Sequence, residues 1–143
     1  MLVAALKTNT IALTNGASTN LPGLLIEAVP SYNTTPANLS YHPKGVGNGY
    51  ILTIGGKRLY ISGDSEDIPE MRTLQRIDVA FLNMNQPYTM SLSQAVSAVR
   101  AFHPGVVYPD HFRNMDNTFT DLNSFKQQVL TNPAVEVRLR KWY

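Results

Sequence analysis

The chain of 143 residues contains no cysteine, which excludes disulfides and thiolate metal sites within it and fits a reducing compartment. Charged side chains are also scarce, at 15% of the residues with a net charge of +2. Basic residues cluster only at 138–141, and so short a cluster is more typical of a solvated strand end than of a nucleic-acid interface. No apolar run approaches the roughly 18 residues that span a bilayer. We therefore expect a cytoplasmic protein with neither nucleic-acid nor membrane partners.

The residues that are present indicate a globular chain. Hydrophobic residues make up 43% of the sequence, an ordinary share for a folded protein. The length suits a single domain over residues 1–143 with a substantial core. The apolar segment 1–6 is too short for a signal peptide, and we interpret it as the remnant of a structural element.

Strand and helix patterns alternate from residue 57 onward, which predicts an α/β fold. Before that point, Gly55-Gly56 joins two apolar runs, and two glycines in this position predict a hairpin. The expected strands cover residues 10–14, 24–29, 50–54, 57–61, 78–82, 106–108 and 135–139. The expected helices begin near residue 66 and span 91–102 and 118–130.

The starts of the expected helices carry polar signals. Ser91 and Gln94 have the spacing of a capping box, in which each side chain satisfies a backbone N–H of the first turn. We interpret Glu66, Asp67 and Glu70 as helix-start residues, because acidic side chains are favoured at the positive end of a helix dipole.

Two expected strands end in side chains that can bind metals. Asp64 follows the strand 57–61 in the run Gly63-Asp64-Ser65, and His111 follows the strand 106–108. Ligands of α/β proteins gather at such carboxyl ends. Taken alone, each residue has an ordinary alternative, a turn or cap for Asp64 and a loop position for His111. Asp110 is a candidate to anchor the second ring nitrogen of His111, although adjacent strand residues point to opposite sides.

The segment 31–49 is a long loop rich in Asn, Thr, Pro and Gly, and loops of this length are often functional. Tyr32, Asn33 and His42 lie within it, and we predict that these three side chains bind substrate. The alternative is that Tyr41 and His42 pack the loop onto the domain.

An ordered set of segments gives the sequence a family resemblance. The set resembles the C-terminal half of the metallo-β-lactamase-fold hydrolases, and it looks closest to the branch that includes ascorbate-6-phosphate lactonase-like proteins. The segments run from about residue 24 to 112 and comprise Glu27–Asn33, Tyr41–Gly45, Leu59–Ser65, Ile77–Leu82, Pro87–Met90 and Val106–His111.

The resemblance implies roles for two residues. In that family the Asp of the Gly-Asp-Ser/Thr segment bridges two metal ions, and the His of the later strand-end segment binds one of them. Asp64 and His111 occupy these places and are the expected metal-binding and catalytic residues. The resemblance implies a divalent metal, with zinc as the expected ion. The implied reaction is hydrolysis of a small ester, lactone, β-lactam or phosphoester by metal-activated water.

The sequence also departs from the family pattern. The family's His-x-His-x-Asp-His motif is absent, and Asn33 stands where relatives carry another histidine ligand. Catalytic zinc normally needs three protein ligands, so a non-catalytic domain that keeps the fold as a binding or structural module stays open as an alternative. A metal-free hydrolase is disfavoured, since no serine occupies a nucleophile elbow and cysteine is absent.

The family fold is an αββα sandwich, so a chain that resembles one half implies a sheet with helices on one face only. The other face would then expose more apolar surface than monomers usually tolerate. We therefore predict a homodimer in which two copies stack these faces and rebuild four layers.

Overall fold

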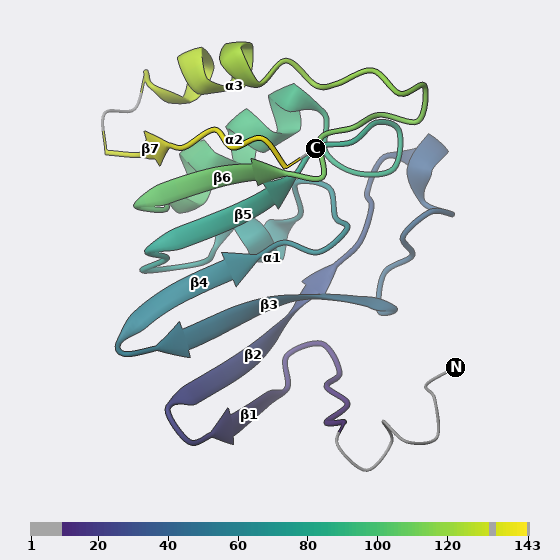
Figure 1. Ribbon diagram of the computed structural model, residues 1–143. Coiled ribbons are helices and arrows are strands. Elements are labelled where there is room, and N and C mark those ends of the chain that lie inside the picture. Colours follow the sequence, from purple (N-terminus) through teal and green to yellow (C-terminus); the bar gives the residue numbers. More distant parts are fainter. Residues whose placement is uncertain (1–9, 132–133, 143) are drawn as a thin grey trace.

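The computed structural model describes residues 10–131 and 134–142, and the predicted element at residues 1–6 lies outside this range. One mixed sheet of seven strands dominates the structure, and its spatial order follows the sequence (Figure 1). Strands β1 to β4 are antiparallel, whereas β4 to β7 are parallel. The strands are β1 (Ser18–Leu21), β2 (Leu24–Ser31), β3 (Gly47–Ile54), β4 (Lys57–Ile61), β5 (Val79–Asn83), β6 (Val106–Asp110) and β7 (Glu136–Val137).

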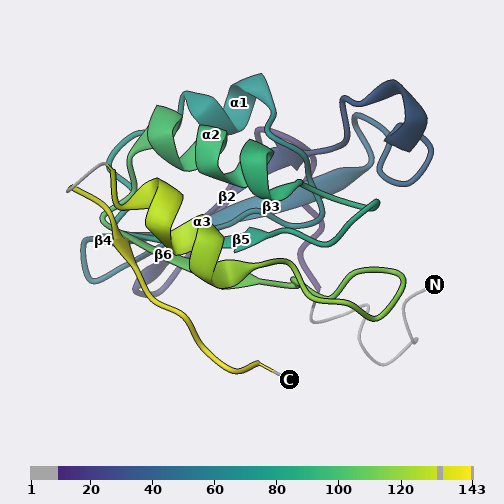
Figure 2. The ribbon, with the colours of Figure 1, turned by 90° about the horizontal axis from the view of Figure 1, so that it is seen from above.

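Helices connect the parallel strands, as such crossovers require. They are α1 (Pro69–Arg72), α2 (Leu92–Phe102) and α3 (Leu122–Val129), and a 3₁₀ turn, η2, covers Pro36–Asn38. The predicted capping box of α2 is confirmed, because the Ser91 hydroxyl accepts from the Gln94 N–H and the Gln94 side chain accepts from the Ser91 N–H. Figure 2 shows α1, α2 and α3 on the same side of the sheet, which confirms the predicted α/β arrangement.

The core lies between these helices and one face of the sheet. Ile51, Tyr60, Ala80 and Val107 are neighbours in register across four strands and are almost fully buried. The Tyr60 ring meets the Phe102 ring of α2 edge to face, with centroids 6.0 Å apart. Every second side chain of β3 to β6 therefore points toward the helices and forms the sheet side of the core.

The opposite face of the sheet is apolar, and no described helix covers it (Figure 2). The Phe81 and Tyr108 rings stack with centroids 5.3 Å apart, and Ile61 is 38% exposed. Within the described residues, a shallow groove on this side is lined by segment 11–13 and by strands β1 to β4. The outward-facing apolar positions are Ile26, Tyr50, Leu52, Leu59, Ile61, Val79, Phe81, Val106 and Tyr108.

Several predicted boundaries are wrong for identifiable reasons. Residues 10–14 form no strand, because Asn48 and Asn15 hold this segment through side-chain hydrogen bonds, including Asn48 Nδ2 to the Leu13 carbonyl at 2.8 Å. Strand β2 continues through Pro30 instead of ending before it. The backbone hydrogen bonds between β2 and the segment that precedes it stop at Ala28, so this edge of β2 needs no N–H donor at Pro30, and proline is tolerated there.

The C-terminal elements are shorter than predicted. Helix α3 begins only at Leu122, because the Asp121 side chain caps it by accepting from the Asn123 and Ser124 N–H groups. The closing edge strand is reduced to the two residues of β7. Among the described residues, no helix is long and apolar enough to cross a membrane, and the cytoplasmic location stays a prediction.

Candidate functional site

The carboxyl ends of β2, β4, β5 and β6 meet at one edge of the sheet. Strands β4, β5 and β6 are parallel, and β2 points the same way because antiparallel β3 separates it from β4. The segments that leave these ends carry Asn33, Asp64, Asn85 and His111. This edge is therefore where side chains from distant parts of the sequence can act on one molecule.

Asp64 stands on a tight turn after β4 that only glycine can make. Gly63 has φ +62°, and a Cβ atom there would lie 2.6 Å from the Asn48 carbonyl oxygen. The Ser31 hydroxyl donates to the Asp64 carbonyl at 2.7 Å, and the Asn83 amide donates to the Gly63 carbonyl. These contacts fix the turn while the Asp64 side chain stays 46% exposed and open to a ligand.

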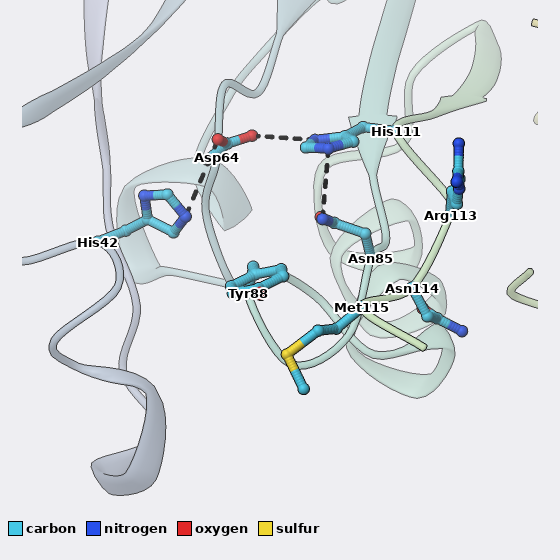
Figure 3. Close-up of a pocket in the computed structure, with 8 residues that line it drawn as sticks. All are labelled: His42, Asp64, Asn85, Tyr88, His111, Arg113, Asn114 and Met115. Carbon is cyan, nitrogen blue, oxygen red and sulfur yellow. Dashed lines mark hydrogen bonds and ion pairs between the residues drawn. The ribbon is translucent and has the colours of Figure 1, made fainter. Parts of the chain in front are cut away.

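His111 faces Asp64 across the site. It follows β6 with φ +40°, and its Nδ1 lies 3.3 Å from Asp64 Oδ1 (Figure 3). Its other ring nitrogen, Nε2, lies 3.3 Å from Asn85 Nδ2. The ring is thus held between a carboxylate and an amide.

His42 approaches the same carboxylate from the long loop. Its Nε2 lies 3.9 Å from Asp64 Oδ2, so Asp64 sits between two imidazoles (Figure 3). The His42 carbonyl accepts from the Asn33 N–H at 2.8 Å, and the neighbouring Tyr41 ring meets Tyr88 edge to face at 4.9 Å. The loop thus packs onto the domain and also places His42 beside Asp64, and the substrate-binding role of His42 stays a prediction.

A buried carboxylate anchors the loop that carries His42. Glu66 is fully buried, and its Oε2 accepts from the Thr34 and Thr35 N–H groups at 2.8 and 2.7 Å and from the Thr34 hydroxyl at 2.9 Å. Its Oε1 accepts from Asn38 Nδ2 at 3.1 Å. Burial opposes ionisation, but these hydrogen bonds outweigh it and hold the pKa of Glu66 below its ordinary value.

The helix-start interpretation of Glu66 is therefore wrong, because α1 begins only at Pro69. Asp67 also precedes the helix, and its Oδ2 accepts from Arg72 at 2.6 Å. Glu70 does lie in the first turn of α1, where its carboxylate accepts from the Tyr32 hydroxyl at 2.8 Å.

A pocket of about 500 Å³ opens over these residues. It combines the Asp64 carboxylate, two imidazoles and one guanidinium with neutral side chains, so it can hold a small polar molecule beside the carboxylate. Its lining consists of His42, Asp64, Asn85, Tyr88, His111, Arg113, Asn114 and Met115.

The structure brings Asp64, His111 and His42 of the predicted site together, but it does not bring Tyr32 and Asn33 to the pocket lining. Tyr32 is 5% exposed and accepts from Lys44 Nζ at 3.1 Å. Asn33 is 1% exposed, and its amide donates to the Asn38 and Tyr88 carbonyls at 3.1 and 2.8 Å. Both support the loop, and their substrate-binding role stays a prediction.

Asp110 does not contact the His111 ring, contrary to the role considered from the sequence. Its Oδ1 is buried without a hydrogen-bond partner among the described residues. Burial raises the pKa of Asp110 to about 6, the charge of His111 opposes this rise, and Asp64 adds to it. Asn85, which the sequence interpretation left without a role, makes the ring contact instead. The available signal was its position two residues beyond the end of β5.

The donor chemistry at this edge fits a divalent metal, but the number of ligands is short. Imidazole nitrogen and carboxylate oxygen are ordinary zinc ligands. The 3.3 Å between Asp64 Oδ1 and His111 Nδ1 is close to the ~3.3 Å that separates two ligands of one tetrahedral ion with bonds of ~2.0–2.1 Å. Within residues 10–131 and 134–142, no three such side chains are placed so that they alone would hold a metal. The cluster therefore fits part of a metal site.

A family model, related sequences and solved structures all place the chain in the same protein family. The family described as Beta-lactamase superfamily domain matches residues 2–112. A UPF0173 metal-dependent hydrolase of Ligilactobacillus salivarius is 36% identical over 119 residues, which cover 81% of this chain and 52% of that protein. A candidate metal-dependent hydrolase of known structure from Parabacteroides distasonis is 49% identical with a TM-score of 0.81, over 90% of this chain and 56% of that one.

A third relative extends the match to archaea. Igni18, a metallo hydrolase from Ignicoccus hospitalis, is 30% identical with a TM-score of 0.76, over 92% of this chain and 57% of that chain. The chain thus spans a little more than half the length of these relatives.

Proposed function

Because the chain belongs to the β-lactamase superfamily, whose relatives here are named as metal-dependent hydrolases, we propose that it carries part of a metal-dependent hydrolytic site. The observation that supports this most directly is the position of Asp64 between the His111 and His42 rings, at 3.3 and 3.9 Å. Sheet topology alone requires no such cluster. The cluster of Asp64, His111 and His42 joins three separate segments of the sequence at the edge where α/β proteins bind ligands.

In this proposal Asp64 and His111 are metal ligands, and zinc is the expected ion. His42 either completes the ligand set or contacts the substrate. A bound metal would lower the pKa of water and polarise the scissile bond. The pocket beside it is suited to a small ester, lactone, β-lactam or phosphoester. The further assignment to the ascorbate-6-phosphate lactonase-like branch is part of the same proposal.

We also propose that a second copy of the chain covers the uncovered sheet face. That face presents a continuous apolar surface, and two copies stacked on it would give the four layers of the family fold. In sedimentation velocity we expect a dimer whose share grows with concentration. Ile61→Lys, on this face, should yield monomers, whereas Leu130→Lys, exposed at the end of α3, should not. A parent chain that stays monomeric at all concentrations would contradict the proposal.

Elemental analysis of the purified protein tests the metal site. We expect about one divalent ion per chain, lost in Asp64→Ala and in His111→Ala. His103→Ala is a matched control, because His103 and His111 share positive φ values of 48° and 40°, and His103 is exposed at the end of α2. Metal-free parent protein, or variants that retain the metal, would favour the alternative of a non-catalytic binding module.

A further inference from the structure

The imidazole of His111 is held at both nitrogens, and one of the two contacts has a defined direction. Nδ1 faces the Asp64 carboxylate at 3.3 Å, and Nε2 faces Asn85 Nδ2 at 3.3 Å. Asn85 is 3% exposed, so little of its amide is open to water that could replace this contact.

Thr89 determines which end of the Asn85 amide faces the ring. The fully buried Thr89 hydroxyl accepts a hydrogen bond from the backbone N–H of Asn85 at 3.0 Å. Its own hydrogen therefore goes to an acceptor, and the nearest is Asn85 Oδ1 at 2.7 Å. With Oδ1 occupied by Thr89, the NH₂ group is the end that points at His111.

We propose that Asn85, oriented by Thr89, is a positioning residue that selects the tautomer of His111. An amide N–H that donates to Nε2 requires a lone pair there, so the proton of the neutral ring lies on Nδ1. That proton points at Asp64 Oδ1, and an ionised carboxylate has no proton of its own and can serve only as the acceptor. The hydroxyl, the amide, the ring and the carboxylate thus form one chain of hydrogen bonds with a single direction.

An amide at this place also suits the metal site, and this step rests on the proposed function. A cation bound at Nδ1 would leave the ring proton on Nε2, which then needs an acceptor. Asn85 can supply one by turning its amide over. The Thr89 hydroxyl can then donate to a second acceptor instead of Asn85 Oδ1, because the backbone carbonyl of Asn85 lies 3.3 Å away. A carboxylate or an alkyl group at position 85 would serve only one of these two states or neither.

The nitrogen-15 shifts of the imidazole in metal-free protein test the tautomer directly. The chain has three histidines, so removing His42 or His103 assigns the spectrum without ambiguity. With the ring in its neutral form, which the nitrogen-15 spectrum itself identifies, we expect Nε2 of His111 to be unprotonated in the parent. Asn85→Asp keeps the shape but removes the donor, and it should move the proton to Nε2. Asn123→Asp, the same change at an exposed position of α3, should leave the spectrum unchanged.

A second pair of variants tests Thr89 without altering the amide. Thr89→Val removes the hydroxyl and should give a mixture of both tautomers, whereas Thr89→Ser should restore the parent pattern. A protonated Nε2 in the parent, or Asn85→Asp and Thr89→Val spectra identical to the parent, would overturn the proposal.

Zinc titration separates this proposal from the proposed function. If the parent binds Zn²⁺, Asn85→Ala should weaken binding roughly 10–100-fold, as other losses of a partner to a metal-bound histidine do. Unchanged zinc affinity in this variant would count against Asn85 as a positioning residue. If the parent binds no Zn²⁺, the proposed metal site fails, and the tautomer in metal-free protein alone decides the role of Asn85.

Discussion

The buried carboxylate of Glu66 offers the sharpest test of how the site is built. Its four hydrogen bonds reach residues 34, 35 and 38 of the loop that carries His42. In Glu66→Gln the remaining oxygen can keep the three donors at Oε2, but the new NH₂ group meets the NH₂ group of Asn38. One charge-assisted bond, worth ~1.5–3 kcal/mol, is then lost, and the other three weaken.

Removing a buried charge also recovers part of its desolvation cost, so the net loss should be about 2–3 kcal/mol in the free energy of unfolding. Urea unfolding followed by circular dichroism measures it. For a slope of about 1.5–2 kcal/mol per M, the midpoint should fall by roughly 1–2 M. Glu136→Gln is the control, because Glu136 is exposed and its side chain accepts only from Arg138 among the described bonds.

The effect of Glu66→Gln should depend on pH with a defined sign. The pKa of Glu66 is lowered in the folded state, so its stabilising effect is complete above the ordinary value of 4.5 and fades as the pH falls through the folded-state pKa. The difference between parent and variant should therefore shrink below about pH 4.5. A variant within ~0.5 kcal/mol of the parent at pH 7, the usual spread of neutral surface changes, would refute the reasoning.

Three further outcomes follow from single contacts. Gly63→Ala should lower stability by about 1–3 kcal/mol and weaken metal binding, because φ is +62° and the new Cβ would approach the Asn48 carbonyl; denaturation and zinc titration measure the two effects. Ser91→Ala should cost about 1 kcal/mol in urea unfolding, since it removes the cap of α2, and an unchanged midpoint would contradict this. Leu82→Ala should cost about 2–5 kcal/mol, because Leu82 is fully buried, and a loss below 1 kcal/mol would indicate a loosely packed core.

Much of the fold follows from local sequence signals. Period-two and period-3.6 patterns, the capping box of Ser91 and the turn at Gly55-Gly56 predicted most strands and helices near their observed positions. These signals report local backbone preference and one-sided burial, which neighbouring residues largely determine. The prediction failed at residues 10–14, where side-chain bonds from Asn15 and Asn48 replace a strand ladder.

By itself, the sequence determined the α/β class and, through the family resemblance, singled out Asp64 and His111 at two strand ends. Only the tertiary structure decided which residues support them. Glu66 looked like a helix start, and Asn85 was marked only by its place just beyond a strand end, yet Glu66 anchors the loop of His42 and Asn85 contacts the His111 ring. The reason is physical, because hydrogen bonds between segments 26 to 31 residues apart depend on how strands and loops pack, and local propensity carries no record of that packing.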